Sequence, residues 1–242
     1  MKKTTLITGA GRGIGLEIAK LFASKKENLI LVIRKKNQIK EINKIRKMYQ
    51  SNIKVFLGDL NNLNFIKKIG KQTNDVNTVI NNASGENQKY FTDVTEKDLS
   101  KMINVNLIAN FMITKIFVKK MIKKKIRGNI INLSSQLGHI GAFNRSIYCM
   151  AKFGIEGLTK SLAMDLGKHG IRVNSVAPTK TIVKNSEKKS SKRLNVIKNK
   201  IPLGKFSTTE EIASIVYFLT TDSAASITGT SIISDGGWTA GK

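Results

Sequence analysis

A tyrosine and a lysine stand four residues apart in the stretch SIYCMAKFGIEG, residues 146–157. If this stretch is helical, the phenol of Tyr148 and the ammonium of Lys152 lie on one face, because four residues span about one helical turn. Such a pair could act as the proton-transfer centre of a reaction. Neighbours with this spacing are also common on ordinary helices. The pair alone therefore leaves both interpretations open.

A glycine-rich segment, TGAGRGIG at residues 8–15, follows directly after the first apolar run of the chain. Glycines in such a turn let the backbone approach a pyrophosphate closely, and the helix that follows directs its first amides at the negative charge. The position between an expected strand and an expected helix supplies the context that this motif requires. The segment therefore predicts a dinucleotide-binding turn. The residues expected at the cofactor are Gly9, Gly11, Arg12, Gly13, Ile14 and Gly15.

The end of the second expected strand indicates which dinucleotide is bound. A ribose 2′-hydroxyl is usually held by an acid about 20 residues after the glycines, whereas a 2′-phosphate is held by arginine. The chain carries Arg34 and Lys35 there, with no acidic residue between Glu27 and Glu41. Arg34 and Arg12 could clamp a phosphate, although both could also be solvated bases of a basic protein. NADP(H) is therefore the expected cofactor, with NAD(H) as the alternative.

Short apolar runs alternate with amphipathic segments along the whole chain. Apolar runs without strict alternation are typical of strands buried on both faces. The runs are Thr4–Thr8, Leu29–Ile33, Ile53–Leu57, Thr78–Asn81, Asn129–Leu133, Val173–Ala177 and Thr230–Ile233. The amphipathic segments are Ile14–Ser24, Gln38–Tyr49, Leu99–Lys124, Tyr148–Lys168 and Thr209–Thr220. This order predicts an α/β protein with a Rossmann fold, a doubly wound parallel sheet of about seven strands with helices on both faces.

A chain of 242 residues is of a size that often forms one such domain. No internal repeat or linker marks a second domain, so residues 1–242 are expected to form a single NAD(P)-binding domain. The basic and polar segment 179–200 is too long for a simple connection. We expect it to form a lid over the substrate.

The formal net charge of +26 could attract polyanions such as nucleic acids. The basic residues are, however, spread over the whole chain, and Lys, Asn and Ile are used heavily throughout, which is typical of compositional drift. No recognisable nucleic-acid-binding module is present. A nucleic-acid partner is therefore not expected, whereas attraction to an acidic protein or an anionic substrate stays an alternative.

The N-terminus and the cysteine content indicate a soluble, cytoplasmic protein. The chain leads from Met1 directly into a strand-like run instead of a signal peptide, and it contains no apolar run long enough to cross a bilayer. Its single cysteine, Cys149, cannot form an internal disulfide. His139 and His169 have no acidic or cysteine cluster beside them in the sequence, so no metal site is expected.

Several motifs resemble, in the same order, those of the short-chain dehydrogenases/reductases, and the resemblance covers the whole chain. The motifs are TGAGRGIG at 8–15, GDL at 58–60, NNASG at 81–85, NVNL at 104–107, INLSSQ at 131–136, YCMAK at 148–152, IRVNSVAP at 171–178, IPLGKFSTTEEIA at 201–213 and ISDGGW at 233–238. The resemblance implies that the catalytic residues are Asn106, Ser135, Tyr148 and Lys152. It implies that further cofactor contacts come from Asp59, Leu60, Asn82, Ala83, Tyr148, Lys152, Pro178 and Thr181.

The resemblance also implies how these residues act. Tyr148 would give a proton to the developing alkoxide in reduction, or take one in oxidation, while hydride moves to or from the nicotinamide. A free tyrosine has a pKa of about 10, and Lys152, which would also bind the nicotinamide ribose, is expected to lower it. Ser135 would hold the substrate oxygen. Asn106 would hold a water that links Lys152 to solvent.

Three positions depart from the usual pattern of the family. Thr179 follows Pro178 where the family usually has glycine, Val183 stands in place of a threonine, and Ser84 stands in place of a glycine. Thr181 is expected to supply the contact to the carboxamide that Val183 cannot make. The loop and the pocket should therefore differ from those of the commonest members.

Two enzymatic functions fit these features. A small polar or anionic substrate, such as a polyol, sugar or hydroxy acid, is slightly favoured by the segment 136–140, by Thr179 and by the bases of the expected lid. Those bases are Lys180, Lys184, Lys188 and Lys189. The alternative is a 3-oxoacyl-[acyl-carrier-protein] reductase of fatty-acid synthesis, whose acidic carrier could meet three other bases. These are Lys125, Arg127 and Lys168.

A third function, of a different class, is a non-catalytic protein that binds NADP(H) or nucleic acid. The intact residues Ser135, Tyr148 and Lys152 argue against it. The resemblance further suggests a homo-oligomer, a tetramer or a dimer, whose interface uses part of the helix at 99–124 and part of the helix that carries Tyr148. No membrane partner is expected.

Overall fold

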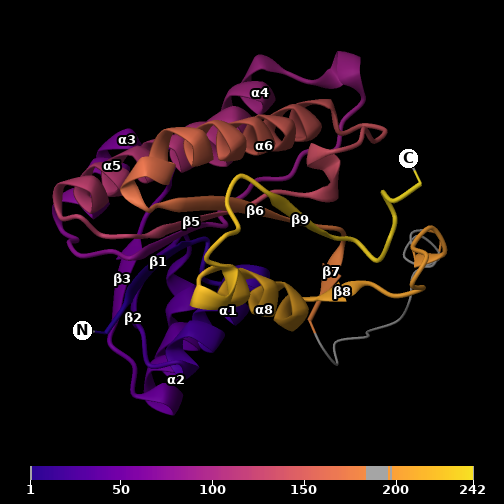
Figure 1. Ribbon diagram of the computed structural model, residues 1–242. Helices are drawn as coiled ribbons and strands as arrows, with labels where there is room; N and C mark the ends of the chain where they lie inside the picture. Colours follow the sequence, from indigo (N-terminus) through magenta and orange to yellow (C-terminus); the bar gives the residue numbers. More distant parts are fainter. Residues whose placement is uncertain (1, 184–195, 197, 242) are drawn as a thin grey trace.

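Seven parallel strands form the central sheet of the computed structural model, which describes residues 2–183, 196 and 198–241 (Figure 1). The strands are β1 (Thr4–Thr8), β2 (Asn28–Ile33), β3 (Ile53–Leu57), β4 (Thr78–Asn81), β5 (Asn129–Leu133), β6 (Arg172–Pro178) and β9 (Ser231–Ser234). Their order across the sheet is β3-β2-β1-β4-β5-β6-β9. The direction of winding reverses between β1 and β4, which is where doubly wound sheets bind dinucleotides. The predicted fold is confirmed.

Burial explains why the strands could be recognised from apolar runs. Every residue of β4 and β5 is buried, because helices cover both faces of the sheet at its centre. The edge strand β3 is different, since Lys54 and Leu57 in it are exposed. The central strands are therefore apolar along their whole length. They lack the two-residue alternation that is typical of a sheet with one face exposed to solvent.

Helices cover both faces of the sheet, in two layers that Figure 1 shows above and below the strands. One layer contains α1 (Gly13–Ser24), α2 (Ile39–Tyr49) and α8 (Thr209–Leu219). The other contains α3 (Leu63–Lys71), α4 (Glu96–Ile103), α5 (Ala109–Lys123) and α6 (Ser146–Leu166). Each layer has its own apolar core, around Phe22 on one face and around Phe117 on the other. The sequence did not predict α3, a short helix that buries little more than Ile66 and Ile69.

A π-helical turn, Asn104–Ile108, joins α4 to α5 within the segment that the sequence predicted as one helix. The continuous run Glu96–Lys123 is long and apolar enough to cross a membrane by length and composition, which the sequence had not predicted. Core helices of globular proteins meet the same criterion. Ile113 and Phe117 of this run are each 1% exposed and pack against the sheet, so the run serves as a core helix.

Two short strands lie beyond the carboxyl end of β6. They are β7 (Thr181–Ile182) and β8 (Ser207–Thr208), which pair in parallel. Most of the predicted lid, 179–200, lies outside the described residues, as do Lys184, Lys188 and Lys189. The lid therefore stays a prediction.

Candidate active site

The predicted site residues come from distant parts of the chain, and the sheet brings them together. Thr8 ends β1, Asn82 follows β4, Ser135 follows β5 and Pro178 ends β6. These four strands are parallel, so their carboxyl ends share one edge of the sheet. The fold therefore places these predicted site residues near one another.

The turn between β1 and α1 requires glycine at two positions. Gly9 has a φ of +64°, a left-handed conformation that residues with a side chain rarely adopt. A Cβ atom on Gly15 would lie 2.3 Å from the carbonyl oxygen of Gly9, so no side chain fits there. In the described part of the chain, the N-cap residue Arg12 makes no side-chain hydrogen bond to α1. The first amides of α1 are thus available to an anion.

Thr8 connects this turn to the loop after β4. Its buried hydroxyl oxygen accepts hydrogen bonds from the amides of Asn82 and Ala83, each at 3.0 Å. The side-chain amide of Asn82 donates in return to the carbonyl oxygens of Thr8 and Gly9, at 3.0 and 3.1 Å. The two predicted cofactor residues Asn82 and Ala83 are therefore fixed against the glycine turn.

A cavity of about 550 Å³ lies between the glycine turn and the ends of β2, β3 and β4. Its walls include eight predicted cofactor residues, which are Gly9, Gly11, Arg12, Arg34, Asp59, Leu60, Asn82 and Ala83. The volume is that of a small-ligand pocket, and the uncapped helix and the two arginines suit an anionic ligand. The residues present therefore fit a nicotinamide dinucleotide.

Other predicted cofactor residues do not line this cavity in the described part of the chain. They are Gly13, Ile14, Gly15, Tyr148, Lys152, Pro178 and Thr181. Gly15 shapes the turn from behind, and Tyr148 and Lys152 belong to the cluster on α6 described below. Pro178 is buried and Thr181 lies half-buried in β7.

The end of β2 carries charges of both signs. The amides of Arg34 and Lys35 donate to the side-chain oxygen of Gln38, at 3.3 and 3.0 Å, and Gln38 also covers Gly11. Glu41 lines the same cavity and forms an ion pair with Lys44 at 2.8 Å. The hydrogen bond from Lys44 lowers the pKa of Glu41 below its usual value. The sequence missed both Gln38 and Glu41, because their position over the cavity depends on how α2 packs.

The predicted catalytic residues meet at the first turn of α6. The ammonium nitrogen of Lys152 lies 5.6 Å from the centre of the Tyr148 ring and donates a hydrogen bond of 2.8 Å to the carbonyl oxygen of Leu133. Ser135, which follows β5, lies close enough to Tyr148 to oppose the rise in its pKa. Lys152 is 3% exposed, whereas Tyr148 is half-buried. The structure thus assembles the serine, the phenol and the ammonium that the sequence predicted.

The pKa values of this pair differ from the expectation. Burial lowers the pKa of Lys152 to about 8, and the charges of Glu156 and Glu86 oppose this effect. Burial also raises the pKa of Tyr148 above its usual value, although hydrogen bonds to Ser135 and Ser84 oppose the shift. The predicted lowering by Lys152 is therefore not found, because burial outweighs the neighbouring charges. Tyr148 is protonated at neutral pH, as a proton donor must be.

Asn106 makes contacts that the sequence did not predict. Its side-chain oxygen accepts from the amide of Gly85 at 2.6 Å, and its amide nitrogen donates to the carbonyl oxygen of Gly85 at 3.2 Å. The π-helical turn directs this side chain inward, where it is 3% exposed. Asn106 thereby fixes the loop after β4. Its predicted role in holding a water stays a prediction.

Further polar groups near Tyr148 also escaped the sequence. The Arg145 guanidinium lies 5.9 Å from the centre of the Tyr148 ring and donates to the carbonyl oxygen of Asn87 at 3.2 Å. Glu86 acts on both Tyr148 and Lys152 through its charge. Arg145 stands three residues before Tyr148 in the sequence, which was the only signal that could have identified it.

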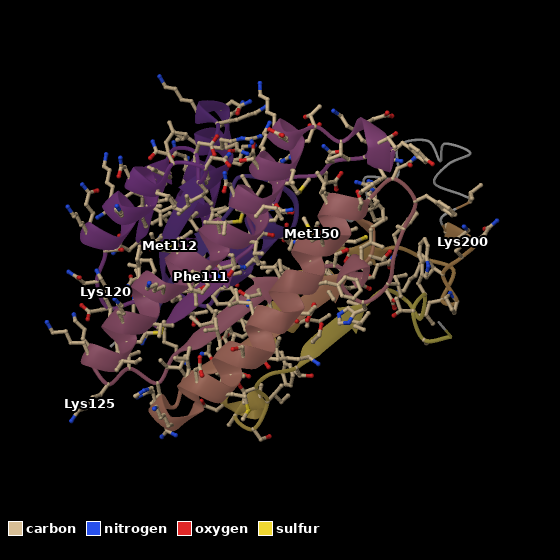
Figure 2. The ribbon with its side chains drawn as sticks, turned by 90° about the horizontal axis from the view of Figure 1, so that it is seen from above. Phe111, Met112, Lys120, Lys125, Met150 and Lys200 are labelled. Atoms are coloured by element: carbon tan, nitrogen blue, oxygen red, sulfur yellow. The ribbon has the colours of Figure 1, made fainter. Side chains whose placement is uncertain are left out.

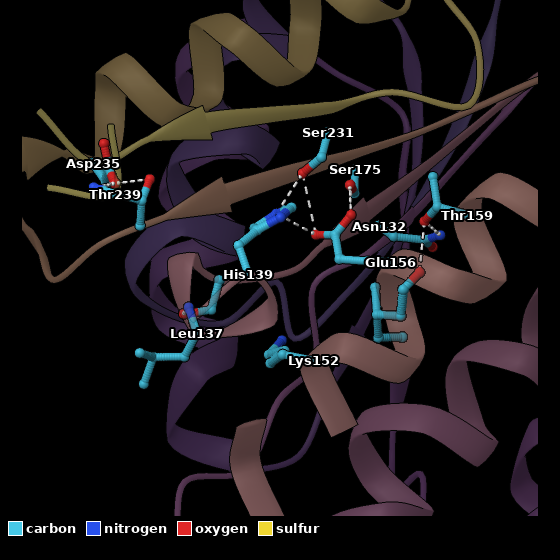
Figure 3. A network of polar contacts seen from close by, with 12 residues as sticks. Asn132, Leu137, His139, Lys152, Glu156, Thr159, Ser175, Ser231, Asp235 and Thr239 are labelled. Atoms are coloured by element: carbon cyan, nitrogen blue, oxygen red, sulfur yellow. Dashed lines mark hydrogen bonds and ion pairs between the residues drawn. The ribbon is translucent and has the colours of Figure 1, made fainter. Parts of the chain in front are cut away.

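A second polar cluster lies behind Lys152 (Figure 3). The carboxylate of Glu156 contacts His139, Ser175 and Ser231, which come from three other elements. The sequence placed no acidic group beside His139, because Glu156 is brought there by the packing of α6 against β6 and the turn at 136–138. The spacing of Glu156 from Lys152, one helical turn, was a readable signal.

Two buried polar atoms near the catalytic serine lack a hydrogen-bond partner among the described residues. They are the side-chain oxygen of Gln136 and the hydroxyl of Thr179, on residues that are 6% and 8% exposed. Buried polar groups are usually satisfied. A polar substrate could supply the missing partners.

Comparisons with known proteins agree with this geometry. A family model described as Enoyl-(Acyl carrier protein) reductase matches residues 9–239. The chain is 33% identical over 235 residues to the 3-oxoacyl-[acyl-carrier-protein] reductase FabG of Rickettsia prowazekii (strain Madrid E), which covers 97% of this chain and 96% of the relative. It is 36% identical over 242 residues to the protein of that name in Buchnera aphidicola subsp. Baizongia pistaciae (strain Bp), with 98% and 97% covered. Among solved structures, it is similar to 4-hydroxyisoleucine dehydrogenase complexed with NADH, at a TM-score of 0.92, 32% identity and 100% coverage of both chains.

Proposed function

The chain belongs to the short-chain dehydrogenase/reductase family of NAD(P)-dependent oxidoreductases, and we propose that it is an NADPH-dependent 3-oxoacyl-[acyl-carrier-protein] reductase. The observation that carries the proposal is the buried ammonium of Lys152, 5.6 Å from the centre of the Tyr148 ring, with Ser135 near the phenol. The two relatives named FabG support the substrate class. They favour the thioester over the small polar substrate that the sequence slightly preferred.

The proposed mechanism assigns a step to each residue of this cluster. The bound nicotinamide dinucleotide supplies the hydride that reduces the 3-oxo carbon. Ser135 donates a hydrogen bond to the carbonyl oxygen and orients it. Tyr148 transfers its proton to that oxygen as the alkoxide forms, which yields the 3-hydroxy product. The positive charge of Lys152 stabilises the phenolate that Tyr148 becomes.

The preference for NADPH rests on the basic end of the cofactor cavity. Arg12 and Arg34 both line it, and guanidinium groups bind phosphate oxygens in a bidentate manner. Glu41 in the same wall is held by Lys44, so its charge is partly neutralised by that pair. This leaves the arginines to recognise a 2′-phosphate.

The bases predicted to meet an acidic carrier lie far from Tyr148. Arg127 lies against Gly170, beside Lys168, at the carboxyl end of α6. Tyr148 lies at the opposite end of this helix, which has 21 residues and is about 30 Å long. Figure 2 likewise shows Lys125 far from Met150 in the first turns of α6. A carrier protein that delivers its acyl chain to this subunit's active site would therefore contact other bases, such as Arg145.

A second candidate function is the reduction or oxidation of a small polar substrate. The side-chain oxygens of Gln136 and Thr179, which lack a partner among the described residues, favour it. A substrate hydroxyl could donate to the Gln136 oxygen, and a hydroxyl or carboxylate could accept from Thr179. The similarity to 4-hydroxyisoleucine dehydrogenase supports the same class.

Homo-oligomerisation in the cytoplasm is part of the proposal. Figure 2 shows Phe111 of α5 and Met150 of α6 on the side of the helices turned away from the sheet. These side chains are 43% and 49% exposed, and Phe153 and Met164 of α6 are exposed as well. An apolar surface of this kind suits contact with a second copy in a dimer or tetramer.

A substrate panel tests the function. Absorbance follows the oxidation of NADPH and NADH with a 3-oxoacyl thioester and acetoacetyl-carrier protein, and the reduction of NADP⁺ and NAD⁺ with small hydroxy acids. We expect the highest kcat/KM for the carrier-bound thioester with NADPH. The Tyr148→Phe variant, which retains the ring, should lose about 10³-fold in kcat while it still binds NADPH. A higher kcat/KM for a hydroxy acid would establish the second candidate, and turnover retained by Tyr148→Phe would refute the mechanism.

A further inference from the structure

A buried carboxylate stands directly behind the catalytic lysine. Glu156 follows Lys152 by one turn of α6, and the two side chains are 6% and 3% exposed. Ser175 donates a hydrogen bond of 2.6 Å to one carboxylate oxygen, and Ser231 donates one of 3.2 Å to the other. The Nε2 atom of His139 lies 3.2 Å from that second oxygen and 3.0 Å from the Ser231 hydroxyl (Figure 3).

These contacts define the charge of the group. A carboxylate only accepts hydrogen bonds, so the His139 nitrogen that faces it must carry a proton, and we assign the Nε2–H tautomer. Glu156 then receives two donors, from β6 and β9, and the Nε2–H of His139 bonds to the Ser231 hydroxyl beside them. Burying an ion costs several kcal/mol unless such partners are present. Glu156 is therefore held as an anion in a fixed position.

The sheet and a glycine create this arrangement. Ser175 of β6 and Ser231 of β9 are direct partners in the parallel register, so both hydroxyls point to the same face, under α6. His139 ends the short turn that begins at Gln136. A Cβ atom on Gly138 would lie 3.0 Å from the carbonyl oxygen of Lys152 and 3.2 Å from the Cγ of Glu156. Glycine at 138 thus allows the turn to approach α6 closely.

Lys152 needs such an anion. Among the described residues, its ammonium donates a hydrogen bond to the neutral carbonyl oxygen of Leu133, which does not compensate a full charge in a buried site. Two carboxylates act on it, Glu156 and Glu86. Glu86 is exposed, and solvent screens an exposed charge strongly. Glu156 is the anion that the protein shields from water.

We propose that Glu156 is a positioning residue of the reaction, which keeps the ammonium of Lys152 charged and in place beside Tyr148. The proposal rests on the catalytic roles proposed above for these two residues. The other charged or titratable groups that face the pair are His139 beside Glu156, and Glu86 and Tyr148 beside Lys152. Glu156 acts through Lys152 and does not contact the substrate.

The pH dependence of reduction tests the proposal. In the wild type, kcat/KM should fall as the pH rises through about 8, where Lys152 loses its proton. Glu156→Gln removes the charge and keeps the size of the side chain. We expect it to move this midpoint down by about one pH unit, so that activity is near that of the wild type at pH 6 and about fivefold below it at pH 8.

Two further variants separate charge from packing. Glu156→Asp retains the charge, so it should retain a midpoint close to that of the wild type even if it is less stable. Asp165→Asn removes an exposed acid of the same helix and should leave the profile unchanged. An unchanged midpoint in Glu156→Gln, or an activity loss equal at every pH, would overturn the proposal.

The unfolding of the cofactor-free protein provides an independent measurement. The pKa of Lys152 in the folded state lies below its ordinary value, so its protonation costs stability as the pH falls from about 10.5 to about 8. Glu156 offsets that cost only while Lys152 is charged. Glu156→Gln should therefore lower Tm more at pH 7 than at pH 9. In the Lys152→Met background, which retains His139, this difference between the two pH values should disappear.

The outcomes distinguish the two proposals. If Tyr148→Phe retains turnover, the proposed mechanism fails, whatever Glu156→Gln does. A second outcome is that Tyr148→Phe is inactive, but Glu156→Gln changes the pH dependence of Tm equally whether residue 152 is lysine or methionine. In that case only the role of Glu156 fails.

Discussion

Two regions of the cleft hold charges in different ways. At the ends of β2 and β3, Arg34 and Asp59 are exposed around an open cavity. Behind the carboxyl end of β5, Lys152 and Glu156 are nearly inaccessible. Lys152 is bonded to β5, and Glu156 is bonded to β6 and β9. We call the first the adenosine side and the second the catalytic side.

The difference indicates how each side responds to change. Charges at the adenosine side are screened by water and ions, so each contributes a modest and salt-dependent share of binding. Charges at the catalytic side interact in a medium of low dielectric constant, and removing one partner leaves the other uncompensated. Substitutions should therefore have large effects at the catalytic side and graded effects at the adenosine side.

The largest effect is expected for Lys152→Met. This variant removes the charge that stabilises the Tyr148 phenolate, so kcat should fall by about 10³-fold in the absorbance assay. Lys160→Met is the matched control, because Lys160 is an exposed lysine of the same helix, and it should retain kcat. A similar loss of kcat in both variants would mean that the effect does not depend on the buried position of Lys152. The proposed contrast between the two sides would then be wrong.

The sequence predicted the two sides unequally. Tyr148, Lys152 and the glycine turn could be read locally, because their spacing or position relative to a strand carries the information. Glu156 has the same one-turn spacing from Lys152, but its partners Ser175 and Ser231 are 19 and 75 residues away. Only the register of β6 with β9 brings those hydroxyls together. The raised pKa of Tyr148 could not be predicted either, since burial depends on the packed structure.

The same distinction applies to the fold. The seven strands of the central sheet were predicted to within about one residue, because each contains a short apolar or β-branched run, and at the centre of the sheet this run is continuously buried. The helix α3 was missed because nine residues with two large buried side chains leave a weak periodic signal. The π-helical turn at Asn104–Ile108 was also missed, because no propensity distinguishes it from the helix around it. Its inward Asn106 was nevertheless identified, through the resemblance to the family.

An intermediate effect is expected for Thr8→Val, at the boundary of the two sides. Valine keeps the shape of threonine but leaves the amides of Asn82 and Ala83 without their acceptor. The free energy of unfolding should fall by about 1–3 kcal/mol, as measured by urea denaturation. The Kd of NADPH should also rise, because the loop after β4 is no longer fixed to the glycine turn.

Thr114→Val provides the control for this prediction. Thr114 is equally buried and accepts a hydrogen bond of 2.9 Å from Asn81, but among the described residues its hydroxyl bonds to neither the glycine turn nor Asn82 and Ala83. The Thr114→Val substitution should lower the free energy of unfolding by a similar amount and leave the Kd of NADPH unchanged. If Thr8→Val also leaves this Kd unchanged, the turn and the loop do not cooperate in binding.

The smallest effect is expected for Arg34→Ala on the adenosine side. Removing one exposed guanidinium from a 2′-phosphate should raise the Kd of NADPH about tenfold, which corresponds to about 1.4 kcal/mol, and change that of NADH less than about twofold. Calorimetric titration at low and at physiological salt should show that the effect shrinks as salt screens the charge. Lys36→Ala removes an exposed base that does not line the cavity in the described structure, so it controls for net charge. Equal losses of affinity for both cofactors would show that Arg34 does not recognise the phosphate. A loss that does not change with salt would show that the charge of Arg34 is shielded from solvent, like that of Lys152.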